Sequence, residues 1–125
     1  MPVRCLIVDD NPGFLRAACR TLEDGGISVV GVASNGSEAL RRIQELRPDV
    51  ALVDIDLGGE SGFDLAQQLM SNGDAPAPTV ILISSYAEQD LADLIAESPA
   101  AAFVSKTDLS ANTVRDVLRR NADLE

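Results

Sequence analysis

The sequence predicts an α/β protein built on a doubly wound, five-stranded parallel sheet with five helices. Short apolar runs rich in branched residues alternate five times with segments whose apolar residues recur at helical spacing. Parallel neighbouring strands need right-handed crossover connections, and the intervening helices supply them. The 125 residues, of which 46% are hydrophobic and 24% charged, suffice for one core, so we expect one domain over residues 1–125.

Near-continuous apolar runs mark the strands. A strand that is buried on both faces of a parallel sheet lacks the alternation of a half-exposed strand, and branched residues suit it. The predicted strands are Val3 to Val8, Ile27 to Ala33, Val50 to Val53, Thr79 to Ile83 and Ala101 to Val104.

The helices are predicted from apolar residues three or four positions apart and from the capping residues before them. Asn11-Pro12 provides an N-cap followed by a proline at the first helical position, and Gly25-Gly26 ends that helix. Asn35 with Glu38 resembles a capping box, and Ser110 is suited to cap the last helix. The remaining predictions are a helix up to Leu46, a helix after Gly62 that reaches Met70, a loop from Asn72 to Pro78 and a shorter helix from Glu88 to Glu97.

Acidic residues outnumber basic ones by 20 to 10, which gives a net charge of -10. This charge should repel a nucleic-acid backbone, so we expect no direct nucleic-acid binding by this domain. The longest apolar runs, such as Val80 to Ile83, are far too short to span a membrane, and the first residues lack a signal-peptide hydrophobic region. We therefore expect a cytoplasmic protein without membrane contact.

The chain contains two cysteines, Cys5 and Cys19, and no histidine. One cysteine falls in a predicted strand and the other in a predicted helix, so both are expected to be buried hydrophobes in a reducing compartment. With no histidine to complete a zinc site, neither is a credible metal ligand.

Polar residues stand just past four of the five predicted strands. Asp9 and Asp10 follow the first strand, Asp54 the third, Ser84 the fourth and Lys106 the fifth. Doubly wound sheets place their ligand site outside the carboxyl ends of the strands, so these residues should meet at one rim. Three converging carboxylates repel one another and need a counter-charge from a hard divalent cation such as Mg²⁺, from Lys106 or from bound protons.

These residue types suit phosphoryl transfer to a carboxylate. One carboxylate can act as nucleophile, a metal held by the acidic pair can neutralise phosphate oxygens, and a lysine and a hydroxyl can bind the other oxygens. Because the chain has no histidine, it lacks the usual catalytic base and any histidine-phosphate relay of its own. The phosphoryl donor has to be another molecule.

The same residues, in this order and spacing, resemble the receiver domains of response regulators over essentially the whole chain. Asp10 precedes Asp54 by 44 residues, and Ser84 and Lys106 follow it by 30 and 52 residues. The resemblance implies a flavodoxin-like (βα)5 fold with strand order 2-1-3-4-5. It also implies two-component signalling, in which a histidine kinase or a phosphotransfer protein donates the phosphoryl group.

By this resemblance Asp54 is the phosphoacceptor. Asp9 and Asp10 would hold Mg²⁺ together with the Asp54 carboxylate and the backbone carbonyl of Asp56, and Lys106 would pair with the phosphoryl oxygens. The domain is then a switch with self-phosphorylation and autodephosphorylation chemistry only, and not an enzyme that turns over a substrate.

The resemblance also implies how phosphorylation is reported. Ser84 would swing toward the phosphoryl group and Phe103 would move with it, which changes the face formed by the fourth helix, the fifth strand and the fifth helix. A homodimer could form there or through the first and last helices, and the output is a downstream response such as transcription. Thr107 stands where many receivers have proline, which is similar to some DNA-binding regulators of the LuxR and NarL type.

The loop after Asp54 departs from the common pattern, because it reads Ile55-Asp56-Leu57-Gly58-Gly59-Glu60. An Asp56 side chain that faces the phosphoryl group would repel phosphate or orient an attacking water. Ser85 is small enough to leave the phosphoaspartate accessible, and Tyr86 is placed to screen it from water. We therefore predict that Asp56→Asn changes the rate of dephosphorylation.

Two other functions fit parts of the sequence. Asp54-Ile55-Asp56 has the Asp-x-Asp form of haloacid-dehalogenase-type phosphatases, although in that family the motif normally follows the first strand. Turnover of a generic phosphate ester would favour this enzyme. The second alternative is a receiver fold that only binds partners and is never phosphorylated, and the intact set of acids with Lys106 argues against it.

Overall fold

The computed structural model describes residues 3–71, 78–85, 93, 96 and 100–123 of the chain. Five parallel strands form one sheet in the order β2-β1-β3-β4-β5, which confirms the predicted fold class and strand order. The strands are β1 (Arg4–Val8), β2 (Ser28–Ala33), β3 (Val50–Asp54), β4 (Thr79–Ser84) and β5 (Ala102–Ser105). The described helices are α1 (Pro12–Asp24), α2 (Gly36–Leu46), α3 (Gly62–Ser71) and α5 (Ala111–Asp123), with one 3-10 turn, η2 (Lys106–Asp108).

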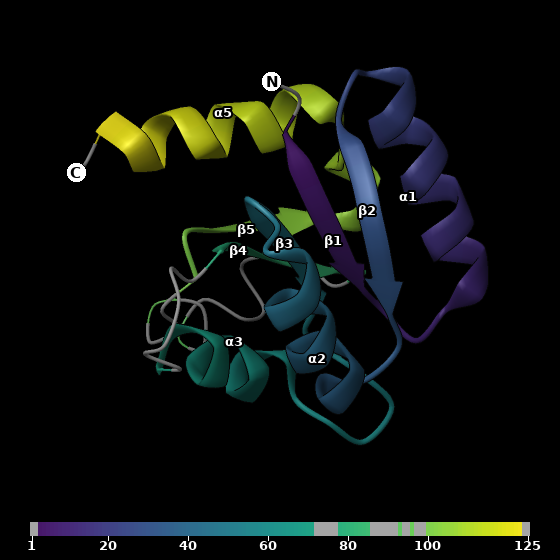
Figure 1. Cartoon of the computed structure of the whole chain (residues 1–125), viewed down its shortest axis with the longest axis vertical. Coiled ribbons are helices and arrows are strands. Elements are labelled where there is room, and N and C mark those ends of the chain that lie inside the picture. Colours follow the sequence, from purple (N-terminus) through teal and green to yellow (C-terminus); the bar gives the residue numbers. More distant parts are fainter. Residues whose placement is uncertain (1–2, 72–77, 86–92, 94–95, 97–99, 124–125) are drawn as a thin grey trace.

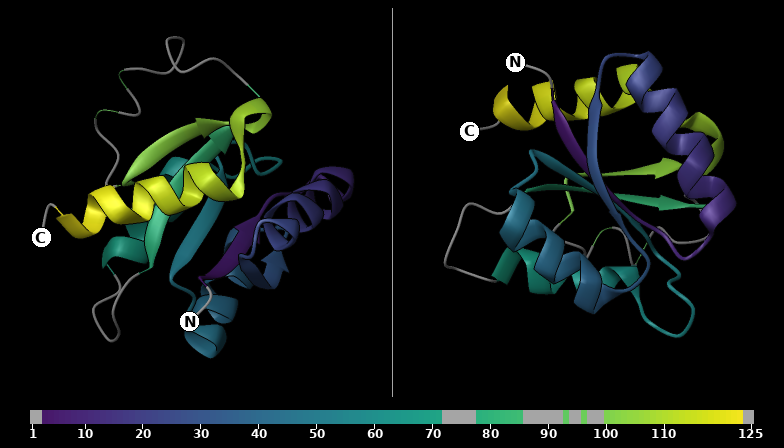
Figure 2. Two further views of the ribbon diagram at one scale, coloured as in Figure 1. Left: turned by 90° about the horizontal axis from the view of Figure 1, so that it is seen from above. Right: turned by 45° about the vertical axis from the view of Figure 1, so that its right-hand side comes forward.

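The sheet lies between two layers of helices. α1 and α5 cover one face, and α2 and α3 cover the other (Figure 1; Figure 2, right). Successive residues of a strand point to opposite faces, so Cys5 and Ile7 of β1 pack with α1 and α5, whereas Leu6 and Val8 pack with α2 and α3. The strands have two apolar faces for this reason, and β3 is buried at every residue.

Short polar side chains begin the helices, as the sequence predicts. Asn11 caps α1, because its Oδ1 accepts the amide protons of Gly13 and Phe14 at 2.9 and 3.2 Å. Asn35 caps α2 by accepting from the Glu38 amide at 2.8 Å. The Glu38 carboxylate reaches the amide of the residue before Asn35 instead of closing the usual capping box.

The strand ends differ from the prediction by one residue. Asp54 and Ser84 are the last residues of β3 and β4 instead of the first residues after them, because Asp54 pairs with Ile83 and Ser84 with Ser105 in the sheet. β5 is also shifted by one residue, and η2 directly after it was not predicted. Asp93 and Ala96 are helical, but the rest of the predicted helix from Glu88 to Glu97 lies outside the described residues, as do Tyr86 and residues 72–77.

Both cysteines have free thiols. Cys5 is buried in β1, as predicted, and burial raises the pKa of its thiol to about 12, which keeps it protonated and unreactive. Cys19 of α1 is only half-buried. Within the described part of the chain, no helix is long and apolar enough to cross a membrane.

Candidate functional site

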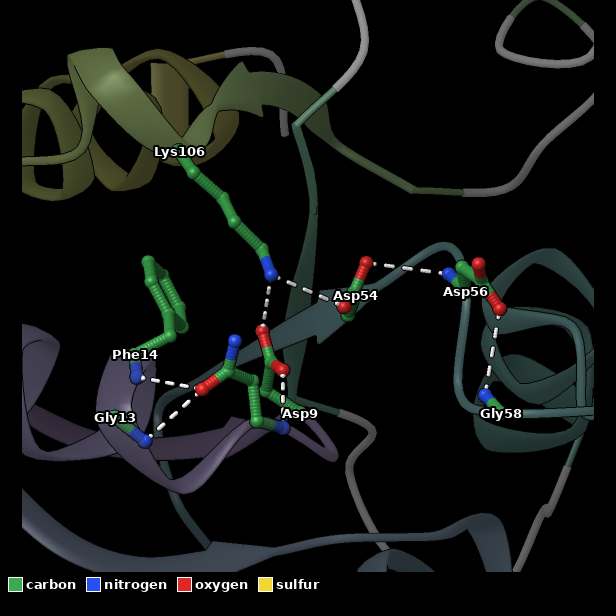
Figure 3. Close-up of polar contacts among 8 residues, drawn as sticks. Asp9, Gly13, Phe14, Asp54, Asp56, Gly58 and Lys106 are labelled. Carbon is green, nitrogen blue, oxygen red and sulfur yellow. Dashed lines mark hydrogen bonds and ion pairs between the residues drawn. The ribbon is translucent and has the colours of Figure 1, made fainter.

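Side chains from the ends of three strands meet at one edge of the sheet (Figure 3). Asp9 follows β1, Asp54 ends β3 and Lys106 follows β5. β1 and β3 are direct neighbours in register, with Val8 opposite Val53, so the two carboxylates emerge side by side. The Lys106 Nζ atom lies 2.8 Å from Asp9 Oδ2 and 3.2 Å from Asp54 Oδ2, so one ammonium bridges both acids.

Asp9 is completely buried. Its Oδ1 atom accepts the amide proton of Asn11 at 2.8 Å, which fixes the carboxylate at the turn into α1. Its Oδ2 atom faces Lys106 but receives no well-aligned hydrogen bond from the described residues. A buried carboxylate oxygen with spare acceptor capacity is an observation that fits a cation ligand.

Asp54 is 6% exposed and is held on two sides. Its Oδ1 accepts the backbone amide proton of Asp56 at 3.1 Å, and its Oδ2 faces Lys106. Burial raises the pKa of the Asp54 carboxyl and the negative charge of Asp9 adds to this, while the Asp56 amide and Lys106 partly oppose the rise. Positive charge beside Asp54 therefore favours its ionised form.

Lys106 is the only lysine in the 125 residues. Its side chain is 16% exposed and points from η2 toward the two acids (Figure 3). Burial lowers the pKa of the ammonium, but its ion pairs with Asp9 and Asp54 outweigh burial and raise the pKa overall. The ring of Phe14 lies under the same ammonium, with Nζ 4.4 Å from the ring centroid.

Asp10 completes an acidic cluster with Asp9 and Asp54. One carboxylate oxygen from each of the three residues lies within 4.8 Å of the other two. Asp10 is exposed, so its carboxylate meets the cluster from the solvent side. Three hard oxygen donors at this separation are able to hold a metal ion, and Mg²⁺ and Ca²⁺ prefer such ligands.

Asp10 and Asp54 of the cluster line an open pocket of about 340 Å³. Among the described residues, the pocket is lined by Asp10, Asn11, Asp54, Asp56, Gly58, Ser84, Ser85 and Lys106. Ser84 is thus brought to the site, where it is buried at the end of β4. Phe103 is half-buried on β5 and packs with the α2 and α3 side of the core, outside this lining.

A sequence profile described as the response regulator receiver domain matches residues 5–118. The chain belongs to the response regulator receiver domains. The match covers β1 from Cys5 on, the other four strands in full and most of the last helix, so the family covers the candidate site as well as the fold.

Solved receivers and longer regulators resemble this receiver. The signal receiver domain of NarL from Mycobacterium tuberculosis is 32% identical, with a TM-score of 0.82 over 94% of this chain and 97% of that one. A response regulator from Burkholderia pseudomallei, solved with a phosphorylated aspartic acid and a calcium ion, is 26% identical, with a TM-score of 0.78 over 97% of this chain and 69% of that one. The transcriptional regulatory protein LiaR of Bacillus subtilis is 30% identical over 94% of this chain and 54% of its own length.

Eight of the curated relatives that the receiver matches are longer proteins. They include protein-glutamate methylesterases as well as transcriptional regulators, and the receiver spans 21% to 54% of their length. The shared part is the receiver itself, so the methylesterase activity of those relatives is not transferred to it.

The loop after β3 shapes the pocket of the receiver. The Asp56 side chain accepts the Gly58 amide proton at 3.3 Å, so it is turned along its own loop while its backbone amide contacts Asp54 (Figure 3). At the far end of the loop, Glu60 Oε2 accepts the Gly36 amide proton at 3.0 Å and thereby ties the loop to the start of α2. Neither this tie nor the ring under Lys106 was predicted, because nothing in the residue spacing indicates them.

If Asp54 accepts a phosphoryl group, replacement of Asp56 by asparagine is expected to change the rate of dephosphorylation by less than the roughly 10²-fold or more expected for a fully positioned general base. Asparagine keeps an Oδ1 acceptor for the Gly58 amide, so the loop is preserved while the charge at the pocket wall is removed. The decay of phosphorylated protein, followed by intact mass in the two variants, measures the effect. An unchanged decay rate would remove this role of Asp56.

Proposed function

We propose that this receiver accepts a phosphoryl group on Asp54 in a Mg²⁺-dependent reaction, with a histidine kinase or a phosphotransfer protein as donor. The observation that supports it most is the surroundings of the Asp54 carboxylate. It lies at an open pocket, beside the only lysine of the chain and within a cluster of three acids. The Burkholderia regulator carries its phosphoryl group on an aspartic acid, which agrees with this choice of residue type.

Each described residue of the site has a part in the proposed reaction. One carboxylate oxygen of Asp54 attacks the phosphorus, and its new O–P bond forms as the bond from phosphorus to the donor nitrogen breaks and the donor keeps the electron pair. Lys106 neutralises charge on the phosphoryl oxygens and, with the Asp56 amide, favours the ionised form of Asp54. Mg²⁺ bound by Asp9, Asp10, Asp54 and the Asp56 backbone carbonyl would neutralise phosphate oxygens.

The proposed output is a shift between two surfaces of the domain. A dianionic phosphoryl group on Asp54 attracts Lys106 and the Ser84 hydroxyl, and Phe103 on β5 follows Ser84. Ser84 pairs with Ser105 in the sheet and Phe103 with Leu82, so both belong to the β4–β5 pair that reports the change. We propose that a homodimer or a linked output domain recognises this surface in the cytoplasm. We also propose that the net charge of -10 prevents the receiver itself from binding nucleic acid.

A direct test is incubation of the protein with Mg²⁺ and acetyl phosphate, followed by intact mass measurement. The wild type is expected to gain one phosphoryl group, and Asp54→Asn, which keeps the size of the side chain, is expected to gain none. Equal uptake by the two proteins would contradict the assignment. No uptake by either would favour a receiver that only binds partners, and turnover of a generic phosphate ester would favour a phosphatase.

Mg²⁺ is expected to stabilise the folded protein, because a ligand that binds only the folded state raises the free energy of unfolding. The gain is about 2.7 kcal/mol when the free ion is at 100 times its dissociation constant. Asp10→Asn removes one acid of the cluster at an exposed position and should abolish most of the gain, whereas Glu45→Gln, an exposed acid on α2, should retain it. Thermal unfolding with Mg²⁺ or with a chelator compares the three proteins. Equal stabilisation of all three would contradict binding at this cluster.

A further inference from the structure

We infer that Phe14 is a positioning residue for Lys106: its ring holds the ammonium beside Asp54 by a cation–π interaction. This inference rests on the proposed function, since it names a residue that prepares Lys106 for the phosphoryl oxygens. The contact is direct, with Nζ 4.4 Å from the ring centroid. A cation within about 6 Å of a ring centroid is attracted by the negative face of the ring.

The ring is held in place by the start of α1. Asn11 Oδ1 accepts the Phe14 amide proton at 3.2 Å, and the same turn holds Asp9 through the Asn11 amide. The half-buried ring also packs against the core between the sheet and the α1 and α5 layer. One turn of chain therefore places both the acid and the aromatic ring that contact Lys106 (Figure 3).

The ring supplies an attraction that the acids cannot supply. Asp9 and Asp54 contact the ammonium, but both also belong to the cluster that fits a metal ion. A carboxylate oxygen that binds a metal ion has part of its negative charge neutralised, so it attracts an ammonium less strongly. The ring carries no charge and no ligand atom for Mg²⁺, so its attraction for Lys106 does not compete with the cluster.

The ring also limits where the ammonium can go. The lysine side chain has a flexible stem, so its ammonium keeps one position only where neighbouring groups restrict it. With carboxylates on one side and the ring face on another, the Lys106 ammonium stays next to the Asp54 Oδ2 atom, 3.2 Å away. A third carboxylate in place of the ring would hold the lysine more strongly and would oppose its transfer to a phosphoryl group.

The contact can be measured directly, because the chain has a single lysine. Protein with isotope-labelled lysine should give one lysine side-chain spin system by NMR, without the need for assignment. In the wild type we expect nuclear Overhauser effects between the Phe14 ring protons and the ε-methylene of Lys106, and an upfield ring-current shift of that methylene. Both should be lost in Phe14→Leu and retained in Phe14→Tyr, with Mg²⁺ absent or present.

The functional consequence is a slower reaction. Phe14→Leu keeps an apolar side chain in the core and removes the ring, so the rate of Asp54 phosphorylation by acetyl phosphate should fall by roughly 2- to 30-fold, the span that corresponds to cation–π energies. Phe14→Tyr should stay within about twofold of the wild type. Phe63→Leu is the matched control, because Phe63 is also half-buried but packs on the opposite face of the sheet.

The outcomes separate this inference from the function on which it rests. If the wild type is phosphorylated and Phe14→Leu reacts as fast, or if Phe14→Tyr is as slow as Phe14→Leu, the positioning role is wrong and the proposed function stands. If the wild type takes up no phosphoryl group, the proposed function fails and the positioning role fails with it. Absence of the ring-to-lysine signals in the wild type overturns the contact itself, whether or not any variant folds less well.

Discussion

Replacement of Lys106 by methionine is expected to slow phosphorylation of Asp54 by about 10²-fold, the usual loss when one charge-stabilising donor is removed from a reaction site. Methionine keeps the length and the apolar stem of the side chain but removes the ammonium that contacts Asp54 Oδ2 at 3.2 Å. No other lysine exists in the chain to replace it. The initial rate of phosphoryl uptake from acetyl phosphate, followed by intact mass, measures the loss.

The matched control is Lys106→Arg, which keeps the positive charge but not the compact shape of the ammonium. A planar guanidinium cannot occupy the point between Asp9 and Asp54 over the Phe14 ring in the same way. We therefore expect Lys106→Arg to recover only part of the wild-type rate of phosphoryl uptake. Uptake by Lys106→Met at the wild-type rate would show that Lys106 is not part of the reaction.

Replacement of Gly62 by alanine is expected to lower the free energy of unfolding by about 3 kcal/mol or more. This loss is at or above the upper end of the destabilisation that overpacking usually causes. A Cβ atom at Gly62 would lie 2.1 Å from the backbone oxygen of Asp54 and 2.7 Å from Ile55 Cα. Both neighbours are backbone atoms at the end of a buried central strand, and the Gly62 amide also donates to the Ile55 carbonyl at 2.9 Å. Relief would therefore require the start of α3 to move away from β3. Chemical denaturation measures the loss.

Gly13→Ala provides the comparison within the same fold. Gly13 lies in the first turn of α1, where its nearest atom to an added Cβ is the Asn11 Oδ1 atom at 3.3 Å, so a small shift of a side chain accommodates it. Alanine favours helix over glycine by up to about 1 kcal/mol, so this variant should be neutral or more stable. A Gly62→Ala protein as stable as the wild type would contradict the close packing of α3 on β3.

The meeting of Asp9, Asp54 and Lys106 was predictable from the sequence because it depends on topology. Parallel strands end at the same edge of the sheet, and the short apolar runs locate those ends to within a residue. The helix starts were predictable for a related reason, since the Asn11 and Asn35 side chains act on amides only two or three residues away. The helix starts can be predicted from neighbouring residues alone, and the meeting of the strand ends needs the strand order in addition.

Other features depend on side-chain directions that spacing does not specify. The sequence shows Phe14 as an apolar residue at helical spacing, and only the path of the Lys106 side chain brings the ammonium over its ring. The sequence allows the Asp56 side chain to face the phosphoryl site or to lie along its own loop. Its hydrogen bond to the Gly58 amide shows that it lies along the loop. The contact between Glu60 and Gly36 joins two loops that no periodic pattern relates.

We expect the fold to make Asp54, and no other acid of the receiver, the phosphoryl acceptor. The most direct measurement is to phosphorylate the wild type with acetyl phosphate and Mg²⁺, reduce the acyl phosphate with borohydride, and sequence the peptides by mass spectrometry to find the altered residue. We expect the modification at position 54 alone. Modification at Asp9, Asp10 or Asp56, or spread over several acids, would contradict the account.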